Sequence, residues 1–306
     1  MKQALITHIA DPDGAFPIVL ANLVLDDITS YSVDVLEVDE TLKKIIDDYD
    51  HIYIVDLCMS DAMAEYIYEN NITKIEVYDH HESRSHLNKY NFIHEIDERN
   101  NRKECGSTLF YEHLTKITNN EILNKESLKK MLELVRMEDT FDFNEADKDL
   151  AFDFAKLYDI YGRDRFITNM TKFIKENDTF YFTEIDKVLL EIEKEKENKY
   201  VKDKLSHMLK AKIDGVKVGI VFAEKNRSII GNKMCELNED IDVSIVVNVD
   251  RSFSYRSKKE VDTTKLSCKY GGGGHFHASG SPLKDDLQKH IIEESFENVI
   301  WEETCK

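Results

Sequence analysis

The stretch KIEVYDHH, residues 74–81, decides the fold of the first half of the chain. Its apolar, β-branched beginning predicts a buried strand, and this strand runs directly into an aspartate and two adjacent histidines. Helix-like segments such as MAEYIYENN, residues 63–71, separate it from other short apolar runs. Those runs are residues 3–9, 31–39 and 51–57. Strands that alternate with helices in this way predict βαβ units and a mainly parallel sheet, which is an α/β fold.

The pattern changes twice further along the chain. Residues 107–210 read as helical, with Ser107 and Thr108 as candidate caps of the first helix and two apolar stripes within 185–209. Strand-like segments then return at 216–223, 242–250, 253–257 and 274–281. We therefore expect three parts: a catalytic α/β domain over 1–184, a helical linker over 185–212 and a smaller α+β domain over 213–306.

The composition excludes several classes of protein. With 42% hydrophobic and 33% charged residues, and no apolar run of about 18 residues, the 306-residue chain is expected to be globular, without a membrane partner. Its N-terminus has no secretory signal, and its five cysteines are widely spread, which favours a reducing cytoplasm. A net charge of −19 argues against a long nucleic-acid duplex, because such a partner needs a broad basic face.

Potential metal ligands follow three of the predicted strands, at the point where each strand ends. They are His8, Asp11 and Asp13 after the first, Asp56 after the third, and Asp79, His80 and His81 after the fourth. The carboxyl ends of parallel strands meet at one edge of a sheet, so these side chains should gather there. Crowded carboxylates repel unless cations bind them, and a mixed Asp/His set without cysteine suits Mn²⁺, Fe²⁺ or Zn²⁺ better than Ca²⁺. Taken singly, Asp11 to Gly14 is also a good turn, and Asp56 a common helix cap.

A second group of residues lies near the C-terminus, in YGGGGHFHASG, residues 270–280. Glycine runs are common in flexible linkers, but the flanks here are strand-like and a histidine follows at once. Glycines let a ligand approach the backbone, whose N–H groups can then bind an anion. The predicted binding residues are Gly272, Gly273, Gly274 and His275, together with Arg256 and Ser257 from the preceding strand.

The order THIADPDG, VDL and YDHH resembles the DHH phosphoesterase superfamily, and the GGGGH run resembles the signature of its DHHA1 substrate-binding domain. The resemblance implies a centre of two metal ions, usually Mn²⁺, with Mg²⁺, Fe²⁺ or Co²⁺ as substitutes. It implies that His8 and Asp11 hold one ion, that Asp13 and His80 hold the other, and that Asp56 bridges them. A last ligand is implied in RMEDTFDF, where we favour Asp139 over Asp142.

The same resemblance assigns the remaining residues of the motif. His81 would lie beside the scissile phosphate, and Asp79 would orient its neighbours. Arg256 would clamp a phosphate of the substrate. Residues 15–17, AFP, depart from the family, because many members have a small Gly-Ser pair there.

The function implied is that of a metal-dependent phosphodiesterase that acts as an exonuclease on short oligonucleotides and releases mononucleotides. The alternatives are a 3′-phosphoadenosine 5′-phosphate (pAp) phosphatase and a phosphodiesterase for cyclic or linear dinucleotides. A rival from another class is a non-catalytic nucleotide-binding regulatory protein on the same fold. The expected partners are short single-stranded oligonucleotides or small nucleotides, and a homodimer is compatible with the sequence.

Overall fold

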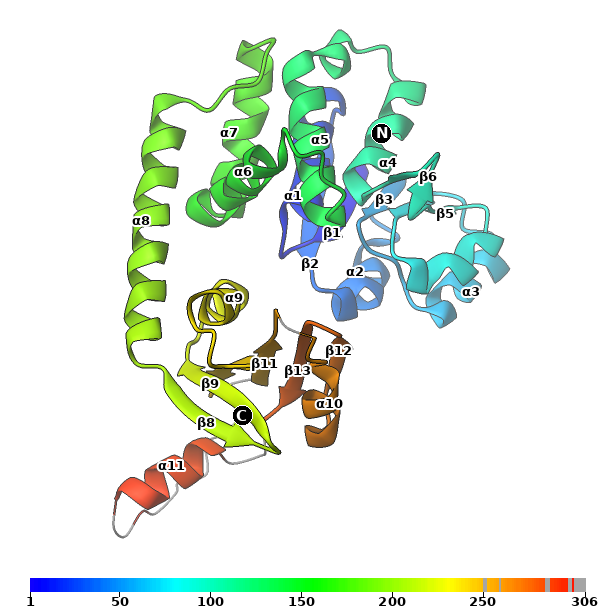
Figure 1. Ribbon diagram of the computed structural model, residues 1–306. Helices are drawn as coiled ribbons and strands as arrows, with labels where there is room; N and C mark the ends of the chain where they lie inside the picture. The colour runs from blue at the N-terminus through cyan, green and yellow to red at the C-terminus, as the bar shows by residue number, and fades with distance from the viewer. Residues whose placement is uncertain (250–251, 259, 284–286, 297–298, 300–306) are drawn as a thin grey trace. The chain divides into compact units, whose positions relative to one another are not determined.

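The computed structural model describes residues 1–249, 252–258, 260–283, 287–296 and 299. The chain forms two compact units, Met1–Glu191 and Ile192–Lys306 (Figure 1). Within the described residues, no helix is both long enough and apolar enough to cross a membrane. The domain boundaries expected from the sequence stay predictions.

The first unit is built on a five-stranded sheet in which every neighbouring pair is parallel. Its strand order is β2-β1-β3-β4-β5. The strands are β1 Gln3–His8, β2 Ile28–Val33, β3 His51–Val55, β4 Ile75–Asp79 and β5 Ile93–Glu95. The predicted α/β fold is therefore confirmed, and the short edge strand β5 is one that the sequence reading missed.

The prediction of one strand over residues 31–39 was wrong in its second half. Strand β2 ends at Val33, and the short 3₁₀ helix η1 Val35–Glu37 leads into helix α2 Val38–Ile45. The backbone N–H of Asp34 donates to the Glu37 carboxylate (3.0 Å), which stabilises this helix start. The buried residues of α2 then recur with helical spacing at Val38, Leu42 and Ile45.

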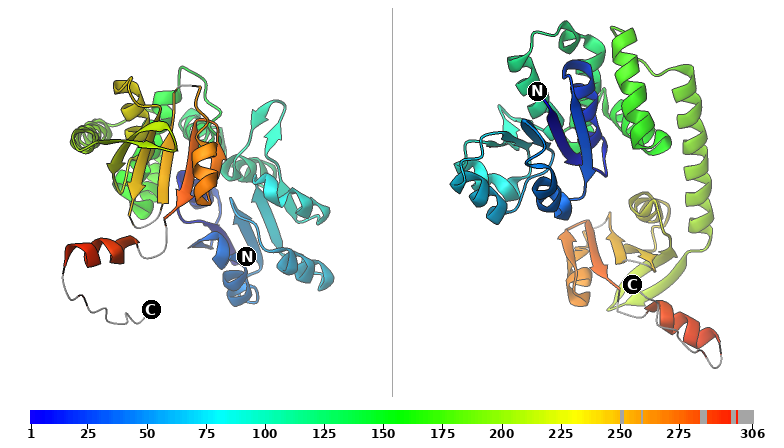
Figure 2. Two further views of the ribbon diagram at one scale, coloured as in Figure 1. Left: turned by 60° about the horizontal axis from the view of Figure 1, so that its bottom comes forward. Right: turned by 180° about the vertical axis from the view of Figure 1, so that it is seen from behind.

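Helices cover both faces of the parallel sheet (Figures 1 and 2). Alternate residues of each strand face opposite sides, so Leu5 belongs to one core and Ala4 and Ile6 to the other. The smaller core packs against α2 and against α3 Asp61–Glu69. The larger core packs against five helices, namely α1 Pro12–Val24, α4 Gly106–Ile117, α5 Glu126–Thr140, α6 Lys148–Tyr161 and α7 Arg163–Glu176. Short elements complete this unit: η2 Glu82–Lys89, η3 Glu121–Asn124 and the hairpin β6 Glu98–Arg99 with β7 Arg102–Lys103.

The second unit follows helix α8, Glu184–Ser206, within which the division between the two units falls. Its six-stranded sheet has the order β12-β13-β11-β10-β9-β8 and is antiparallel except for the pair β9 and β10. The strands are β8 Leu209–Ile213, β9 Val216–Phe222, β10 Val243–Asn248, β11 Ser252–Arg256, β12 Gly273–His275 and β13 Ala278–Pro282. The helices of this unit are α9 Arg227–Leu237, α10 Thr264–Ser267, η4 Cys268–Tyr270 and α11 Leu287–Ser295.

Three details of this unit differ from the expectation or lie beyond it. Leu209, which we placed on an apolar helical stripe, instead begins β8 and pairs with Ile220 of β9. Residue 250, at the end of the expected strand 242–250, is outside the described residues. The prediction of one strand over 274–281 was wrong, because the chain reverses direction there and forms the antiparallel pair β12 and β13. The strands expected at 216–223 and 253–257 are present as β9 and β11, and the α+β character of the unit is as predicted.

A buried arginine ties the C-terminal end of α5 to the segments around it. Only 4% of Arg136 is exposed, and its guanidinium donates to the Glu133 carboxylate (2.7 Å) and to the Asp142 carboxylate (2.8 Å). It also donates to the carbonyl of Lys103 in β7 (3.0 Å) and to that of Asp142 (3.2 Å). These bonds fix the turn that follows α5, because a buried guanidinium that lost one of its acceptors would raise the free energy of the folded state.

We expect Arg136→Met to lower the free energy of unfolding by about 2 kcal/mol, because two partly exposed carboxylates and two carbonyls lose a charged donor. Urea denaturation followed by circular dichroism measures this change. Lys129→Met on the exposed side of the same helix is the matched control, since its pair with Glu126 is a surface ion pair worth at most about 1 kcal/mol. Equal stability of the two variants would contradict the role assigned to Arg136.

The same network predicts a pH dependence. The hydrogen bond from Arg136 lowers the pKa of the Asp142 carboxyl below its usual value. Its stabilising contribution is therefore present above the unfolded pKa of about 3.9 and is lost as the pH falls through the folded value. Between about pH 5 and pH 3, denaturation curves should show a larger loss of stability for the wild type than for Asp142→Asn. Parallel losses in the two proteins would show that this carboxyl does not contribute.

Candidate metal centre

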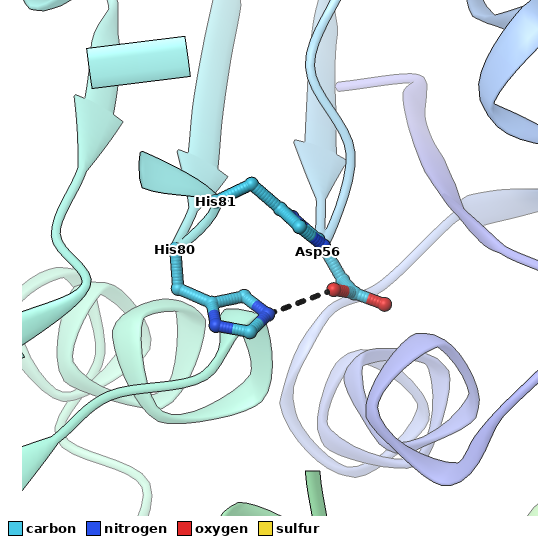
Figure 3. Close-up of side chains that lie close together, drawn as sticks. All are labelled: Asp56, His80 and His81. Carbon is cyan, nitrogen blue, oxygen red and sulfur yellow. Dashed lines mark ion pairs between the residues drawn. The ribbon is translucent and has the colours of Figure 1, made fainter. Parts of the chain in front are cut away.

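The predicted ligands gather at the carboxyl edge of the first sheet. Asp56 follows β3, and His80 and His81 follow β4, so their side chains converge as Figure 3 shows. His80 Nε2 lies 3.3 Å from Asp56 Oδ1. Asp56 has a φ of 60°, a left-handed conformation that is uncommon for a non-glycine residue and is often found at functional sites. With this backbone conformation, the carboxylate lies next to the imidazole that follows the neighbouring strand β4.

Three overlapping groups of side chains bring their ligand atoms within 4.8 Å of one another. They are His8, Asp11 and Asp56; Asp13, His80 and Asp139; and Asp56, His80 and His81. In the first group, His8 Nδ1 lies 2.5 Å from Asp11 Oδ2 and 3.7 Å from Asp56 Oδ2. In the second, His80 Nε2 lies 3.9 Å from Asp13 Oδ2 and 3.4 Å from Asp139 Oδ2. The structure thus brings together all six residues that the sequence singled out as metal ligands.

The electrostatics of this cluster favour a bound cation. Burial, and then the charges of Asp13, Asp11, Asp139 and Asp79, raise the pKa of Asp56 well above its usual value. Burial and the same kind of repulsion raise the pKa of Asp139 to about 8. His80 Nε2 and Asp139 Oδ2 are buried without a hydrogen-bond partner. A mixed set of carboxylates and imidazoles with unused buried atoms fits divalent transition-metal ions.

The geometry distinguishes Asp139 from Asp142, the two residues considered for the last metal ligand. Asp139 lies in the last turn of α5 and belongs to the cluster. Asp142 lies outside it and pairs with Arg136. The residue following Asp139, Thr140, donates from its hydroxyl to the Arg136 carbonyl (2.7 Å). The carboxylate of Asp142 therefore serves the fold of the turn.

Asp13 is completely buried, and the start of helix α4 holds it in place. Its carboxylate accepts hydrogen bonds from the backbone N–H groups of Gly106 (2.7 Å) and Ser107 (2.9 Å). The Ser107 hydroxyl donates to the Asp13 carbonyl (2.9 Å), which has lost its usual helical donor because residue 17 is a proline without an N–H. The sequence reading treated Ser107 and Thr108 as helix caps, whereas the cap position belongs to Cys105. Ser107 instead holds both the carboxylate and the backbone carbonyl of Asp13, a candidate metal ligand.

Two glycines allow backbone segments to approach the centre closely. A Cβ atom on Gly106 would lie 2.7 Å from the backbone nitrogen of Asp56, and one on Gly14 would lie 2.1 Å from the carbonyl oxygen of His8. Both distances are far below normal contact, so only glycine fits at these positions. The Gly14 N–H donates to Asp11 Oδ1 (2.8 Å), which makes Asp11 the cap of α1. The turn and the ligand interpretations of Asp11 are therefore compatible with each other.

The loop between β1 and α1 is also held from outside by helices α6 and α7. Tyr158 donates from its hydroxyl to the carbonyl of Ile9 (2.7 Å). Arg163 donates to four acceptors of the loop at 2.8–3.2 Å. Those acceptors are the carbonyls of His8, Ile9 and Gly14 and the hydroxyl of Thr7. No sequence signal pointed to Arg163, which lies about 150 residues away from the loop.

Asp79 and His81 form a hydrogen-bonded pair, in which Asp79 is buried and His81 lies at the exposed side of the cluster. Asp79 is 1% exposed and accepts hydrogen bonds from the His80 backbone N–H (2.9 Å) and from His81 Nδ1 (2.7 Å). That second hydrogen bond raises the pKa of His81, because it stabilises the charged imidazole. The His81 side chain is 54% exposed, so its other ring nitrogen is free to meet a ligand.

The residues predicted to bind substrate lie in the second unit. Arg256 and His275 stand in one row of the sheet, because Arg256 pairs with Ala278 and Ala278 pairs with His275. Directly opposed residues of antiparallel strands point to the same face, so these two side chains share a face about 10 Å apart. Ser257 is buried, and its hydroxyl bonds to the carbonyl of Val261 and to His277.

The glycines of the run 271–274 differ in the free space around their Cα atoms. A Cβ atom on Gly272 would lie 1.9 Å from the Gly280 carbonyl oxygen, and Gly274 has a φ of 137° and meets Ser279. These two glycines therefore serve the close packing of β12 on β13. Only Gly273 of the three predicted binding glycines has open space around its Cα.

Helix α9 adds two residues that the sequence reading missed. Arg256 donates to the Ser228 hydroxyl in the first turn of α9 (2.7 Å), and its aliphatic chain lies against Gly231. Burial and the neighbouring Arg227 lower the pKa of Arg256. Among the described residues, neither arginine contacts a carboxylate, so this corner of an acidic protein carries uncompensated positive charge.

Comparisons with known proteins identify one relative in sequence and several structures with a similar fold. No protein-family model matches the chain. It is 27% identical over 254 residues to oligoribonuclease NrnB of Bacillus subtilis (strain 168), a match that covers 81% of this chain and 63% of the relative. The matched part therefore spans less than two thirds of that protein.

Two solved structures share the fold. The pGpG-specific phosphodiesterase PggH from Vibrio cholerae aligns with a TM-score of 0.51 and 15% identity, covering 96% of this chain and 97% of that one. RecJ from Thermus thermophilus, in complex with Mn²⁺, aligns with a TM-score of 0.53 and 12% identity over 95% of this chain and 51% of that one. The chain is thus similar in sequence to an oligoribonuclease and shares its fold with two phosphodiester-cleaving proteins, in agreement with its resemblance to the DHH/DHHA1 phosphoesterase superfamily.

Proposed function

We propose that this protein is a metal-dependent phosphodiesterase that hydrolyses short oligonucleotides to mononucleotides. The observation that carries the proposal is the buried cluster of carboxylates and imidazoles with unpartnered ligand atoms at the strand ends. The names of the oligoribonuclease relative and of the pGpG-specific neighbour support the substrate class. Because the second name specifies pGpG, a phosphodiesterase for linear dinucleotides is an alternative within the same class.

The chain's residues fit two divalent ions, for which we propose Mn²⁺. His8 and Asp11 would hold one ion, the group of Asp13, His80 and Asp139 would hold the other, and Asp56 would bridge them. When bound, such ions supply charge neutralisation and Lewis-acid polarisation of a phosphoryl oxygen. Mn²⁺ in the RecJ structure supports this choice of metal, with Mg²⁺, Fe²⁺ or Co²⁺ as substitutes.

The protein's own side chains have distinct tasks in this scheme. Asp79 holds the His81 imidazole by Nδ1, so the opposite ring nitrogen can donate a hydrogen bond to an oxygen of the scissile phosphate. Ser107 and Arg163 keep the ligand loop in place without touching substrate. In the second unit, Arg256 binds a substrate phosphate, because a guanidinium matches phosphate geometry and this one has no acidic partner among the described residues.

A reducing compartment suits this assignment. Cys58, Cys105, Cys235 and Cys268 are free thiols, and Cys305 lies outside the described residues. We propose the cytoplasm as the location, where thiols stay reduced and short RNA fragments arise.

The direct test is Mn²⁺-dependent hydrolysis of a 5′-phosphorylated RNA trinucleotide, with products separated by chromatography over time. Stepwise release of mononucleotides is the expected result, and the order of products gives the polarity. A metal-loaded protein that cleaves neither this substrate nor pGpG would contradict the proposal. Purification without any bound divalent ion would favour the rival, a non-catalytic nucleotide-binding protein.

Asp56→Asn should reduce turnover by at least about 100-fold, because the bridging carboxylate is lost. Asparagine tolerates the left-handed backbone at this position, so the fold should persist. In EDTA, the melting temperature should stay equal or rise, because one of several mutually repelling buried carboxylates is gone.

The measurements are steady-state rates and thermal melts with EDTA or with saturating Mn²⁺. The wild type should gain stability with Mn²⁺, and Asp56→Asn should gain much less. Asp142→Asn is the matched control: it lies in the neighbouring turn but outside the cluster, and should keep both the metal response and the rate. A wild-type rate in Asp56→Asn would refute the metal scheme.

Arg256→Ala should raise KM about 10-fold or more for the trinucleotide and leave the Mn²⁺-induced thermal shift unchanged. The reason is that this arginine lies in the second unit and takes no part in the metal cluster. Lys258→Ala serves as the control, since Lys258 is half exposed and already paired with Glu236 (2.8 Å). If the two variants raised KM equally, only general charge and not a specific phosphate contact would be involved.

A further inference from the structure

Phe141 has two unusual features for a large apolar residue. It ends helix α5 with a φ of 53°, in the left-handed region where glycine is favoured and a bulky side chain is an outlier. It is also 72% exposed, so packing against the described residues covers only a small part of the ring. A strained conformation that places an aromatic ring in solvent is more readily explained by a ligand than by the fold.

The turn that presents this ring is fixed on both sides. Before it, the Thr140 hydroxyl bonds to the carbonyl of Arg136, and after it, the Asp142 N–H donates to the same hydroxyl (3.3 Å). Arg136 holds Asp142 by its carboxylate and its carbonyl. The ring is therefore mounted on a rigid support, as a stacking platform requires.

Neighbouring aromatic side chains support the ring from one side. The rings of Phe141 and Phe143 meet edge to face, with centroids 5.9 Å apart and an interplanar angle of 90°. Phe143 in turn packs on Phe152 of α6, at 4.8 Å between centroids. This chain of contacts anchors Phe141 to the core and, with 72% exposure, leaves ring surface available.

The backbone of Phe141 also lies close to that of a candidate metal ligand. Phe141 is two residues after Asp139, so their Cα atoms are at most about 8 Å apart. A phosphodiester held at the metals would carry a nucleoside on either side of the phosphorus, within reach of this position. Stacking on an aromatic ring is how proteins bind single-stranded bases without reading their sequence.

We propose that Phe141 stacks on a nucleobase next to the scissile phosphate, an inference that rests on the proposed function. A protein partner is a poorer match, because a stable interface needs about 1,000 Å² and not one supported ring. The adjoining Glu138, Asp139 and Asp142 also disfavour an anionic membrane surface.

The test uses two variants and two substrates. Phe141→Gly removes the ring and suits the left-handed backbone, and Phe141→Trp keeps a stacking surface. KM is measured for a 5′-phosphorylated diadenosine dinucleotide and for the same compound with both bases removed. We expect Phe141→Gly to raise KM for the dinucleotide roughly 5- to 100-fold and to leave the abasic compound unchanged. Phe141→Trp should stay within about 3-fold of the wild type.

Two controls separate this effect from damage to the protein. Tyr66→Ala removes another exposed ring, on α3, and should leave KM unchanged for both substrates. The melting temperature of Phe141→Gly should equal or exceed that of the wild type, because glycine adopts this backbone without strain. A wild-type KM of Phe141→Gly for the dinucleotide would overturn the inference and leave the proposed function intact.

A binding measurement keeps the test valid if turnover is not detected. Fluorescence quenching of a 2-aminopurine dinucleotide, titrated with Mn²⁺-loaded protein, reports stacking directly. Weaker binding and less quenching with Phe141→Gly support the inference, and equal binding by wild type and variant overturns it. A change in oligomeric state without a change in nucleotide binding would mark the ring as a protein contact and also overturn it. Absence of both cleavage and binding in the wild type would instead remove the proposed function itself.

Discussion

Buried negative charge at the ends of β1, β3 and β4 is the constraint on which the first unit depends. Asp13 and Asp56 are nearly inaccessible to solvent, and both lie close to His80. Repulsion among these groups would destabilise the sheet edge unless donors and cations offset it. Part of the compensation is built into the chain, since the start of α4 donates two N–H groups to Asp13. The helix dipole of α4 adds to this effect, because its positive end faces the carboxylate.

Close backbone packing follows from this arrangement. Helix α4 can reach Asp13 only if its first residue passes directly over Asp56, which explains the need for Gly106. In the same way, α1 returns over His8 by means of Gly14. The centre is therefore bounded by main-chain atoms on two sides, and its ligands have little freedom to relax. Preorganisation of this kind fixes the distances between the ligand atoms. Selective metal binding requires such fixed distances.

Much of the fold and of the centre could be predicted from sequence because the signals were local. Strands β1, β3 and β4 each carry an apolar run that ends in an aspartate or a histidine, so periodicity and the strand-end rule were sufficient. The segment after Val33 misled the reading, because Val33 and Val35 alternate with polar residues as in a strand. Tertiary packing of Val38 and Leu42 instead favours a helix. The roles of Arg163 and Phe141 could not be predicted from the sequence, for different reasons. The first acts across about 150 residues, and the second matters through its backbone conformation, which residue type alone does not reveal.

Asp139 occupies the last turn of α5, where the helix dipole is negative and no basic residue is present to offset it. A bound cation would offset this unfavourable interaction, so metal uptake should slow the exchange of amide hydrogens in the last turn of α5. The hydrogen bonds from Arg136 hold the following turn with or without metal, so the effect should stay local to this helix end. The rate of amide exchange in one helical turn would therefore report how much of the protein carries metal.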